Sequence, residues 1–247
     1  MASTTAIPVS GARMGVSQSF YFSIAERSYL DFLEKRKARD EAQKVLDGTV
    51  GEEIDEEERH EREYPYDLAN GEASTAAVTT IVFCGMCLEA AIYDFAAWHL
   101  DDNYVKTYLD KLDLVAKWMV IPKLVAQQEI PAGFATHDHL RTLVVLRNSL
   151  VHYRSVPMPF DEADKLKKWT ALNQKEEAIQ DGCARAIKAV IFLSLDMDHI
   201  FSSHGVFNPL PSFREPSKYG TRTPRSHEVE KLVVECREIL ARSRSSA

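Results

Sequence analysis

The chain has 247 residues, of which 45% are hydrophobic and 27% are charged, so it suits one domain with a sizeable core. A net charge of -7 disfavours a protein that coats nucleic acid through a broad basic surface, although a small basic cleft remains compatible with it. Only 10 Gly and 10 Pro argue against a loop-rich β architecture, and 4 Cys are too few for a secreted disulfide scaffold.

Neither a secretory leader nor a membrane span is evident in the sequence. The opening residues, MASTTAIPVSGARMG, lack the apolar stretch of a signal peptide. The chain also contains no run of about 18 uncharged apolar residues. We therefore expect a reduced, cytoplasmic protein that makes no contact with a membrane.

The first quarter of the chain predicts one helix between two irregular segments. Residues 1–16 are expected to form a flexible tail, and residues 17–46 are rich in helix formers before DGTVG breaks the pattern. The acidic run EEIDEEERHERE, residues 52–63, is typical of a solvated helical turn or a disordered insertion. An alternative is a mimic of nucleic-acid charge that occupies a basic cleft. With YPYDLANGEAS after it as a loop, we treat 47–72 as an acidic insertion.

The middle of the chain predicts two helices. Residues 74–100 are apolar nearly all round, which is typical of a helix in the centre of a fold. Asp101 or Asp102 then caps a helix over residues 103–127, and Pro122 is expected to kink or split it.

The remainder predicts three more helices. One runs from about His137 to about Ser155, and one follows an N-terminal cap at Asp161 or Asp164 and ends near Ser203. The last covers about 227–242, after a loop punctuated by Pro and Gly. We find no strand-period alternation of useful length and no internal repeat.

These segments predict an all-α, up-and-down helical bundle of four to five main helices. We expect a flexible tail over residues 1–16, the bundle over 17–204 with its acidic insertion, and a basic loop with a C-terminal helix over 205–247.

One stretch, LRNSLVHYRS at residues 146–155, contains polar side chains that a core helix would not need. On a helical wheel, Leu140, Leu143, Val144, Leu150 and Val151 all fall within about 60° of Arg147. Arg147 therefore lies near the middle of the apolar stripe. Because arginine does not lose its proton, burial there demands a partner or a wet cleft.

Glu89 is the matching anomaly of opposite sign, since it lies inside the apolar helix 74–100. An ion pair between Arg147 and Glu89 would relieve both residues. His152 follows Asn148 by four residues, so these two share one flank, away from Arg147. The length of arginine, a distorted helix end or a site shared between two subunits could bring Arg147 and His152 together. A purely structural ion pair with an ordinary boundary histidine is the alternative.

RNSLVH resembles the R-N-x-x-x-H signature of the HEPN superfamily, the "higher eukaryotes and prokaryotes nucleotide-binding" helical domains. The apolar run TIVFCGMCLEAAIYDFA resembles the second helix of that family, which carries a glutamate, and LDLVAKWMVIPKLV before the motif helix is also similar. The likeness covers about residues 74–203. The family positions fall on Arg147, Asn148, His152 and Glu89.

The resemblance implies a helical bundle that commonly dimerises, and for many members a metal-independent endoribonuclease of toxin–antitoxin, abortive-infection or antiviral systems. Some members carry a modifiable tyrosine two residues after the histidine. In this sequence Tyr153 is adjacent to the histidine and Arg154 takes that place, so regulation by such a modification is not expected.

The chemistry of these side chains agrees with RNA cleavage. His152 can move protons near neutral pH, and Arg147 can stabilise a charged phosphorane through bidentate contacts. Asn148 could orient either group, and Glu89 could hold the guanidinium. No metal or cofactor is needed, and the expected products carry a 2′,3′-cyclic phosphate and a 5′-hydroxyl. Further contacts to RNA are weakly suggested for basic and aromatic residues nearby and in the loop 205–225: Tyr153, Arg154, Arg214, Lys218, Arg222 and Arg225.

Two other motifs predict structure more than chemistry. CGMC, residues 84–87, lies inside an apolar helix and lacks the two further ligands of a zinc site, so its cysteines should be buried and structural. In HDH, residues 137–139, side chains two apart on a helix diverge by about 200°, which disfavours chelation and favours exposed histidines at a helix start.

The sequence thus predicts a metal-independent endoribonuclease that acts on RNA as a homodimer, with a cognate antitoxin or regulatory partner as a further possibility. The alternative function is a non-catalytic helical module for interaction or RNA binding, in which Arg147 and Glu89 are only structural.

Overall fold

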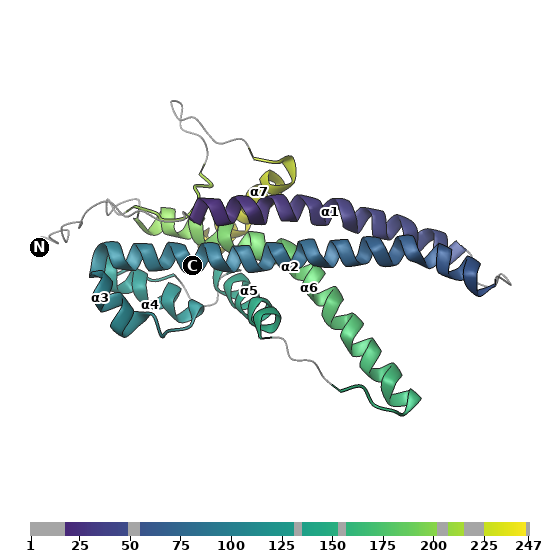
Figure 1. The fold of residues 1–247 in the computed structure, drawn as a ribbon. Helices are drawn as coiled ribbons and strands as arrows, with labels where there is room; N and C mark the ends of the chain where they lie inside the picture. The colour runs from purple at the N-terminus through teal and green to yellow at the C-terminus, as the bar shows by residue number, and fades with distance from the viewer. Residues whose placement is uncertain are drawn as a thin grey trace, which may run out of the picture.

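The computed structural model of the chain describes residues 18–48, 55–130, 135–152, 157–201, 207–214 and 225–245. These residues form helices and no strand, so the predicted all-α class is confirmed. The two longest helices of the first half, α1 (Gln18–Gly48) and α2 (Glu56–Leu100), lie side by side as an antiparallel pair (Figure 1). The helices between residues 102 and 201 contact α2, and the last helix packs on the one before it.

Helix α2 begins much earlier than predicted, and the loop expected over residues 64–74 is wrong. Asp55 caps the helix by accepting a hydrogen bond from the Glu58 backbone N–H at 2.8 Å. The acidic first turn is also favourable at a helix N-terminus. Further along, Ala73 is buried, and Lys35 of α1 pairs with Glu72 at 3.0 Å. Packing against α1 therefore carries the helix through Pro65 and Gly71, which local propensity alone would not predict.

The second half of α2 is the central element of the core, as its composition predicted. Its buried residues run from Ala76 to Ala97 and include many alanines, which allow neighbouring helices to approach closely. By length and composition α2 could also cross a membrane, but 56% of its most apolar window is buried inside the protein. A buried core helix of a soluble protein accounts for the same composition.

After α2 the chain turns through three short elements, α3 (Asp102–Tyr104), the π-helix η1 (Val105–Leu109) and α4 (Leu114–Ala126). Asp101 caps the first of these through the backbone N–H groups of Asn103 and Tyr104, as predicted. Pro122 does not split the helix, because α4 continues through it from Leu114 to Ala126. The break occurs at 110–113, where Asp113 accepts a hydrogen bond from the Ala116 N–H at 2.9 Å and starts the new helix.

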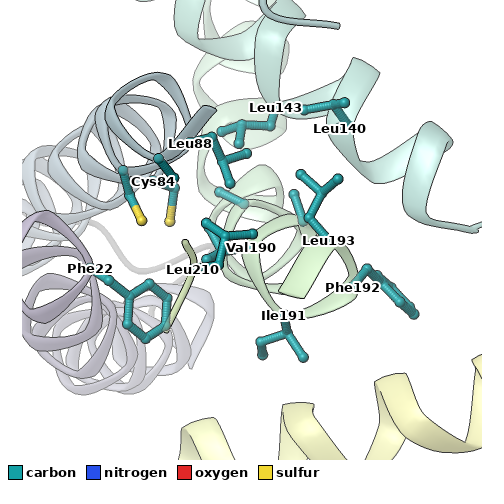
Figure 2. Packing of buried hydrophobic residues seen from close by; sticks show 14 of the residues in the cluster. Phe22, Cys84, Leu88, Leu140, Leu143, Val190, Ile191, Phe192, Leu193 and Leu210 are labelled. Carbon is teal, nitrogen blue, oxygen red and sulfur yellow. The ribbon is translucent and has the colours of Figure 1, made fainter. Parts of the chain in front are cut away.

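Helices α5 (Ala135–Val151) and α6 (Glu162–Phe201) complete the core with α2. Asp161 caps α6 by accepting a hydrogen bond from the Asp164 N–H, as one of the two predicted caps. Figure 2 shows Leu140 and Leu143 of α5 close to Leu88 of α2 and Leu193 of α6. All four leucines are fully buried, so α5 is fixed between two larger helices.

The C-terminal part packs onto the same core. Segment 207–214 places Leu210 and Phe213 in the interior, and Phe213 contacts Phe22 of α1 edge-on at 5.4 Å between ring centroids. Helix α7 (His227–Ser245) then covers α6, with Val229 and Val233 fully buried. The predicted last helix is therefore present and slightly longer than expected.

Candidate functional site

A cavity of about 300 Å³ lies where α5 meets α2 and α4. Its apolar wall comes from leucines and a valine of α4, α5 and the connector before α4, and Gly85 of α2 also lines it. Its polar lining combines three carboxylates, two cations and one amide: Glu89, Asp110, Asp113, Lys117, Arg147 and Asn148. Three of the four residues that the sequence singled out therefore line one cavity.

The side chain of Arg147 packs on α2 at Gly85, where no side chain is in its way. A Cβ added at Gly85 would lie 3.2 Å from Cγ of Arg147, which is tighter than ordinary contact. The stem of the arginine thus packs on the helix backbone, and its guanidinium donates to Oδ1 of Asn148 at 3.3 Å. Its Nε is buried and has no hydrogen-bond partner in the part of the chain that the structure describes. Arg147 therefore retains donor capacity at the cavity.

The predicted ion pair between Arg147 and Glu89 is not formed among the described residues. Glu89 instead accepts a hydrogen bond from Nζ of Lys117 at 2.6 Å. Lys117 is only 5% exposed, and its ammonium also lies 3.4 Å from Asp110. The packing of α4 against α2 places Lys117 beside Glu89, which the position of Glu89 in the sequence could not reveal.

Lys117, Asp110 and Asp113 are lining residues that the sequence did not single out, although a signal for Lys117 exists. Lys117 lies on the buried face of α4 with Leu114, Trp118 and Ile121, at the spacing of one apolar helix stripe. A lysine at such a position is the same anomaly that drew attention to Arg147. Applying that test to every helix would have predicted a second buried cation and the need for nearby carboxylates.

Asn148 connects the cavity to the outer face of α5. Its Oδ1 accepts from Arg147, and its backbone oxygen accepts from the N–H of His152 at 3.0 Å. His152 is exposed at the C-terminal end of α5 and is not part of the cavity lining. On the helical wheel Arg141, Val145, Asn148 and His152 fall within about 60° of one another and form an outward stripe. Arg147 thus faces the interior and His152 the solvent, with Asn148 between them.

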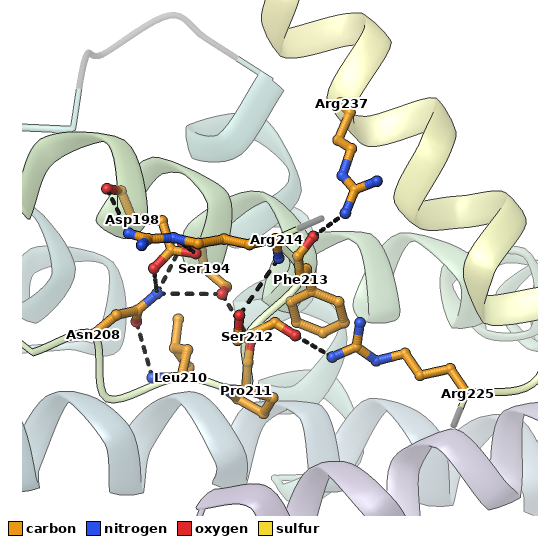
Figure 3. A network of polar contacts seen from close by, with 10 residues as sticks. All are labelled: Ser194, Asp198, Asn208, Leu210, Pro211, Ser212, Phe213, Arg214, Arg225 and Arg237. Atoms are coloured by element: carbon orange, nitrogen blue, oxygen red, sulfur yellow. Dashed lines mark hydrogen bonds and ion pairs between the residues drawn. The ribbon is translucent and has the colours of Figure 1, made fainter. Parts of the chain in front are cut away.

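The two described arginines of the C-terminal loop are used inside the protein, as Figure 3 shows. Nε of Arg214 lies 2.8 Å from Oδ2 of Asp198, and its Nη2 donates to the Asp198 backbone oxygen at 3.0 Å. Arg225 donates to the backbone oxygen of Ser212 and stacks 4.0 Å above the ring of Phe213. These contacts fix segment 207–214 on α6, so both guanidiniums have a structural role. The other predicted RNA contacts, Tyr153, Arg154, Lys218 and Arg222, lie outside the described residues.

The cysteines of the C-x-x-C motif are buried free thiols, as predicted. Cys84 and Cys87 are fully inaccessible to solvent. Burial raises the pKa of Cys87 to about 12 and that of Cys84 well above its usual value. Both thiols therefore stay protonated near neutral pH and are poor nucleophiles.

His139 of the HDH motif is half-buried, so the prediction that it is exposed is wrong. Its Nδ1 lies 2.8 Å from the Ala135 backbone oxygen, and its ring contacts Phe192 at 4.8 Å between centroids. Burial lowers the pKa of this imidazole. His139 therefore belongs to the packing between α5 and α6.

Comparison with known proteins adds nothing to this geometry: no protein-family model, curated protein or solved structure matches the chain.

Proposed function

We propose that this protein is a metal-independent endoribonuclease, in which Arg147 binds a phosphate of RNA and His152 transfers protons. The observation that carries the proposal is the arrangement around Asn148, which accepts a hydrogen bond from Arg147 and lies one turn before His152. A guanidinium with a buried, unsatisfied Nε at a cavity is a ready donor for a phosphate oxygen. The resemblance of RNSLVH to the HEPN signature supports the same reading.

In this proposal the 2′-hydroxyl of RNA attacks the adjacent phosphorus, and the bond to the 5′-oxygen of the next nucleotide breaks. His152 takes the proton of the 2′-hydroxyl or returns one to the leaving 5′-oxygen. Arg147 stabilises the charge that develops on the phosphorane oxygens. Lys117 keeps Glu89 occupied, so the arginine is not neutralised by that carboxylate. The products carry a 2′,3′-cyclic phosphate and a 5′-hydroxyl.

We further propose that the active form is a homodimer whose protomers meet at the outward stripe of α5. Val145 and Val151 are large exposed apolar residues on or beside this stripe. In a two-fold pair, the stripe of one protomer would contact the same stripe of its partner. Such an interface would bring His152 of each protomer toward the cavity mouth of the other. This arrangement would join the interior arginine to the exterior histidine in one site.

A cytoplasmic toxin or antiviral effector, held in check by an antitoxin or regulatory partner, is the biological setting that this proposal implies. The burial of α2 within the protein supports a soluble location without membrane contact.

The second candidate function is a non-catalytic helical module that binds RNA or another partner. Two observations favour it: Glu89 is paired with Lys117, and the His152 side chain is exposed to solvent. Under this alternative, Arg147 and Lys117 serve packing, and no bond of RNA is broken.

Cleavage of labelled single-stranded RNA by the full chain in the presence of EDTA separates the two functions. We expect His152→Ala to slow cleavage by about 100-fold or more, which is the usual loss of a general acid–base group. His60→Ala removes an exposed histidine near the start of α2 and should leave the rate unchanged. Equal rates for His152→Ala and the parent protein would refute the nuclease, and absence of cleavage in the parent would favour the module.

A further inference from the structure

The first half of α6 is the part of the molecule that the proposed site leaves unexplained. In a protein with a net charge of -7, residues 165–175 contain four lysines and no acid. Every buried residue of α6 lies at Gln180 or later along the helix. Figure 1 shows this first half extending away from α1 and α2. We name residues 162–179 the α6 arm.

The α6 arm exposes large apolar side chains that a solvated helix does not need. Trp169 is 57% exposed and Leu166 is 69% exposed. Tryptophan buries a large apolar area when a partner covers it. Leu166 precedes Trp169 by three residues, so the two exposed side chains lie on one side of the helix. An exposed tryptophan on a protruding helix therefore indicates a surface that contacts a ligand.

The lysines lie around this tryptophan. Lys165 precedes Trp169 by one turn and so shares its face, and Lys168 lies on the adjoining flank. Lys165 pairs with Glu162 at 2.5 Å and Lys167 with Asp164 at 3.1 Å, and every one of these side chains keeps part of its surface in solvent. Pairs of this type are worth little and exchange readily for a phosphate. The ammonium of Lys168 donates to the backbone oxygen of Pro157.

Four carboxylates, those of Glu162, Asp164, Glu176 and Glu177, equal the four lysines of the arm in number, but not all of them face its exposed surface. Glu176 is turned toward α2, where it accepts hydrogen bonds from Ser74 at 2.5 Å and Asn70 at 3.2 Å. The exposed surface around Trp169 therefore combines an aromatic face with ammonium groups. Proteins bind single-stranded nucleic acid through this combination, because bases stack on the ring while cations contact the phosphates.

We infer that the α6 arm binds single-stranded RNA, with one base stacked on Trp169 and phosphates on Lys165 and Lys168. The inference rests on the proposed function, since the arm begins ten residues after His152 in the chain and would hold the strand that the site cuts. A rigid duplex hides the faces of its bases from such a ring, so the arm selects unpaired RNA.

The test is the affinity of the full chain for a short fluorescent RNA with 2′-O-methyl groups on every ribose, which removes the nucleophile of cleavage. We expect Trp169→Ala to weaken binding about tenfold, the loss of one stacked base. Lys165→Gln with Lys168→Gln should weaken binding and lower the dependence on salt by about 1.4 in log–log slope. Phe207→Ala and Lys37→Gln are matched controls, because both residues are exposed on other elements and should leave the affinity unchanged.

Three results would overturn the inference. The first is an unchanged affinity for this RNA in both arm variants. The second is a parent dimer that Trp169→Ala converts to monomers of equal RNA affinity, which would make a second copy the occupant. The third is that the arm variants lose binding to vesicles of anionic phospholipid while their affinity for the RNA is unchanged, which would make the occupant a membrane surface.

These experiments distinguish failure of the arm proposal from failure of the nuclease proposal. If unmodified RNA is not cleaved but the arm variants lose affinity for the methylated RNA, the nuclease fails and the arm stands. If His152→Ala stops cleavage while both arm variants bind like the parent, the nuclease stands and the arm fails.

Discussion

The two halves of α6 share one continuous helix but have opposite surroundings. From Gln180 onward the helix touches α2, α5 and α7, and it supplies many fully buried side chains, among them Phe192. Before Gln180 no residue of the helix is buried. Most of the stability of a helix in a protein comes from the packing of one face, so the packed half supports the solvated one. The difference separates residues that hold the fold from residues that are free to bind something else.

Phe192→Ala should produce the largest effect, because it removes a fully buried ring from the packed half. Leaving a cavity of that size costs about 3–5 kcal/mol in free energy of unfolding. Chemical denaturation followed by circular dichroism measures this loss. A cost below about 1 kcal/mol would mean that the packed half is less tightly filled than its burial indicates.

Gly182→Ala tests where the packed half begins. A Cβ at this position would lie 2.2 Å from Cδ1 of Leu146, so α5 or its leucine must move. We expect a loss of about 1–3 kcal/mol in the same denaturation experiment.

Gly71→Ala is the matched control for the glycine variant. Gly71 also lies inside a helix, but a Cβ there meets nothing within 4 Å. Alanine should therefore stabilise the protein by about 0.5–1 kcal/mol through helix propensity alone. Two glycine variants with the same sign of effect would contradict the close approach of α5 to α6.

His139 gives a pH-dependent view of the packed half, because its ring lies against Phe192. Burial is the main cause that lowers its pKa below 6.5, and the nearby Lys188 and Arg185 act in the same direction, while Asp138 and the hydrogen bond to Ala135 oppose them. As the pH drops below 6.5, His139 takes up a proton in the unfolded chain before it does so in the folded protein. The free energy of unfolding therefore falls over the interval from 6.5 down to the folded pKa.

Comparing urea denaturation at about pH 7.5 and about pH 5.5 measures this effect. His139→Gln should lose less stability over that interval than the parent, since its side chain does not titrate. His99→Gln provides a comparison from α2, where burial also lowers the histidine pKa. A parent and a His139→Gln protein with the same pH dependence would show that the ring is already solvated.

Much of this organisation could be predicted from local patterns, and its exceptions have physical causes. Helix-forming residues predicted α1, and continuous apolar character predicted the buried half of α2. One-sided apolar spacing indicated α5 and α7, because burial of one face leaves a 3.6-residue signature. The helical stretch over residues 64–74 escaped prediction, because contacts from α1 hold it and the local sequence favours a turn.

The candidate site was predictable in part for a similar reason. An arginine on an apolar stripe predicts either a buried partner or a solvated cleft, and Arg147 does line a cavity with Glu89. Which cation Glu89 contacts depends on how α4 is oriented against α2, and that orientation is a tertiary property. The partner therefore turned out to be Lys117.

Leu166→Ala should have the smallest effect on the free energy of unfolding. A small loss here, beside the large loss for Phe192→Ala, is what distinguishes the solvated half of α6 from the packed half. Leu166 lies in the α6 arm and is exposed, so its truncation removes little buried area and should change the free energy of unfolding by less than about 0.5 kcal/mol. The measurement is the same urea denaturation, made on dilute protein so that association does not contribute. If the loss instead approaches that of Phe192→Ala and grows with protein concentration, the arm is buried between copies of the chain, and the contrast between the two halves of α6 exists only in the single chain.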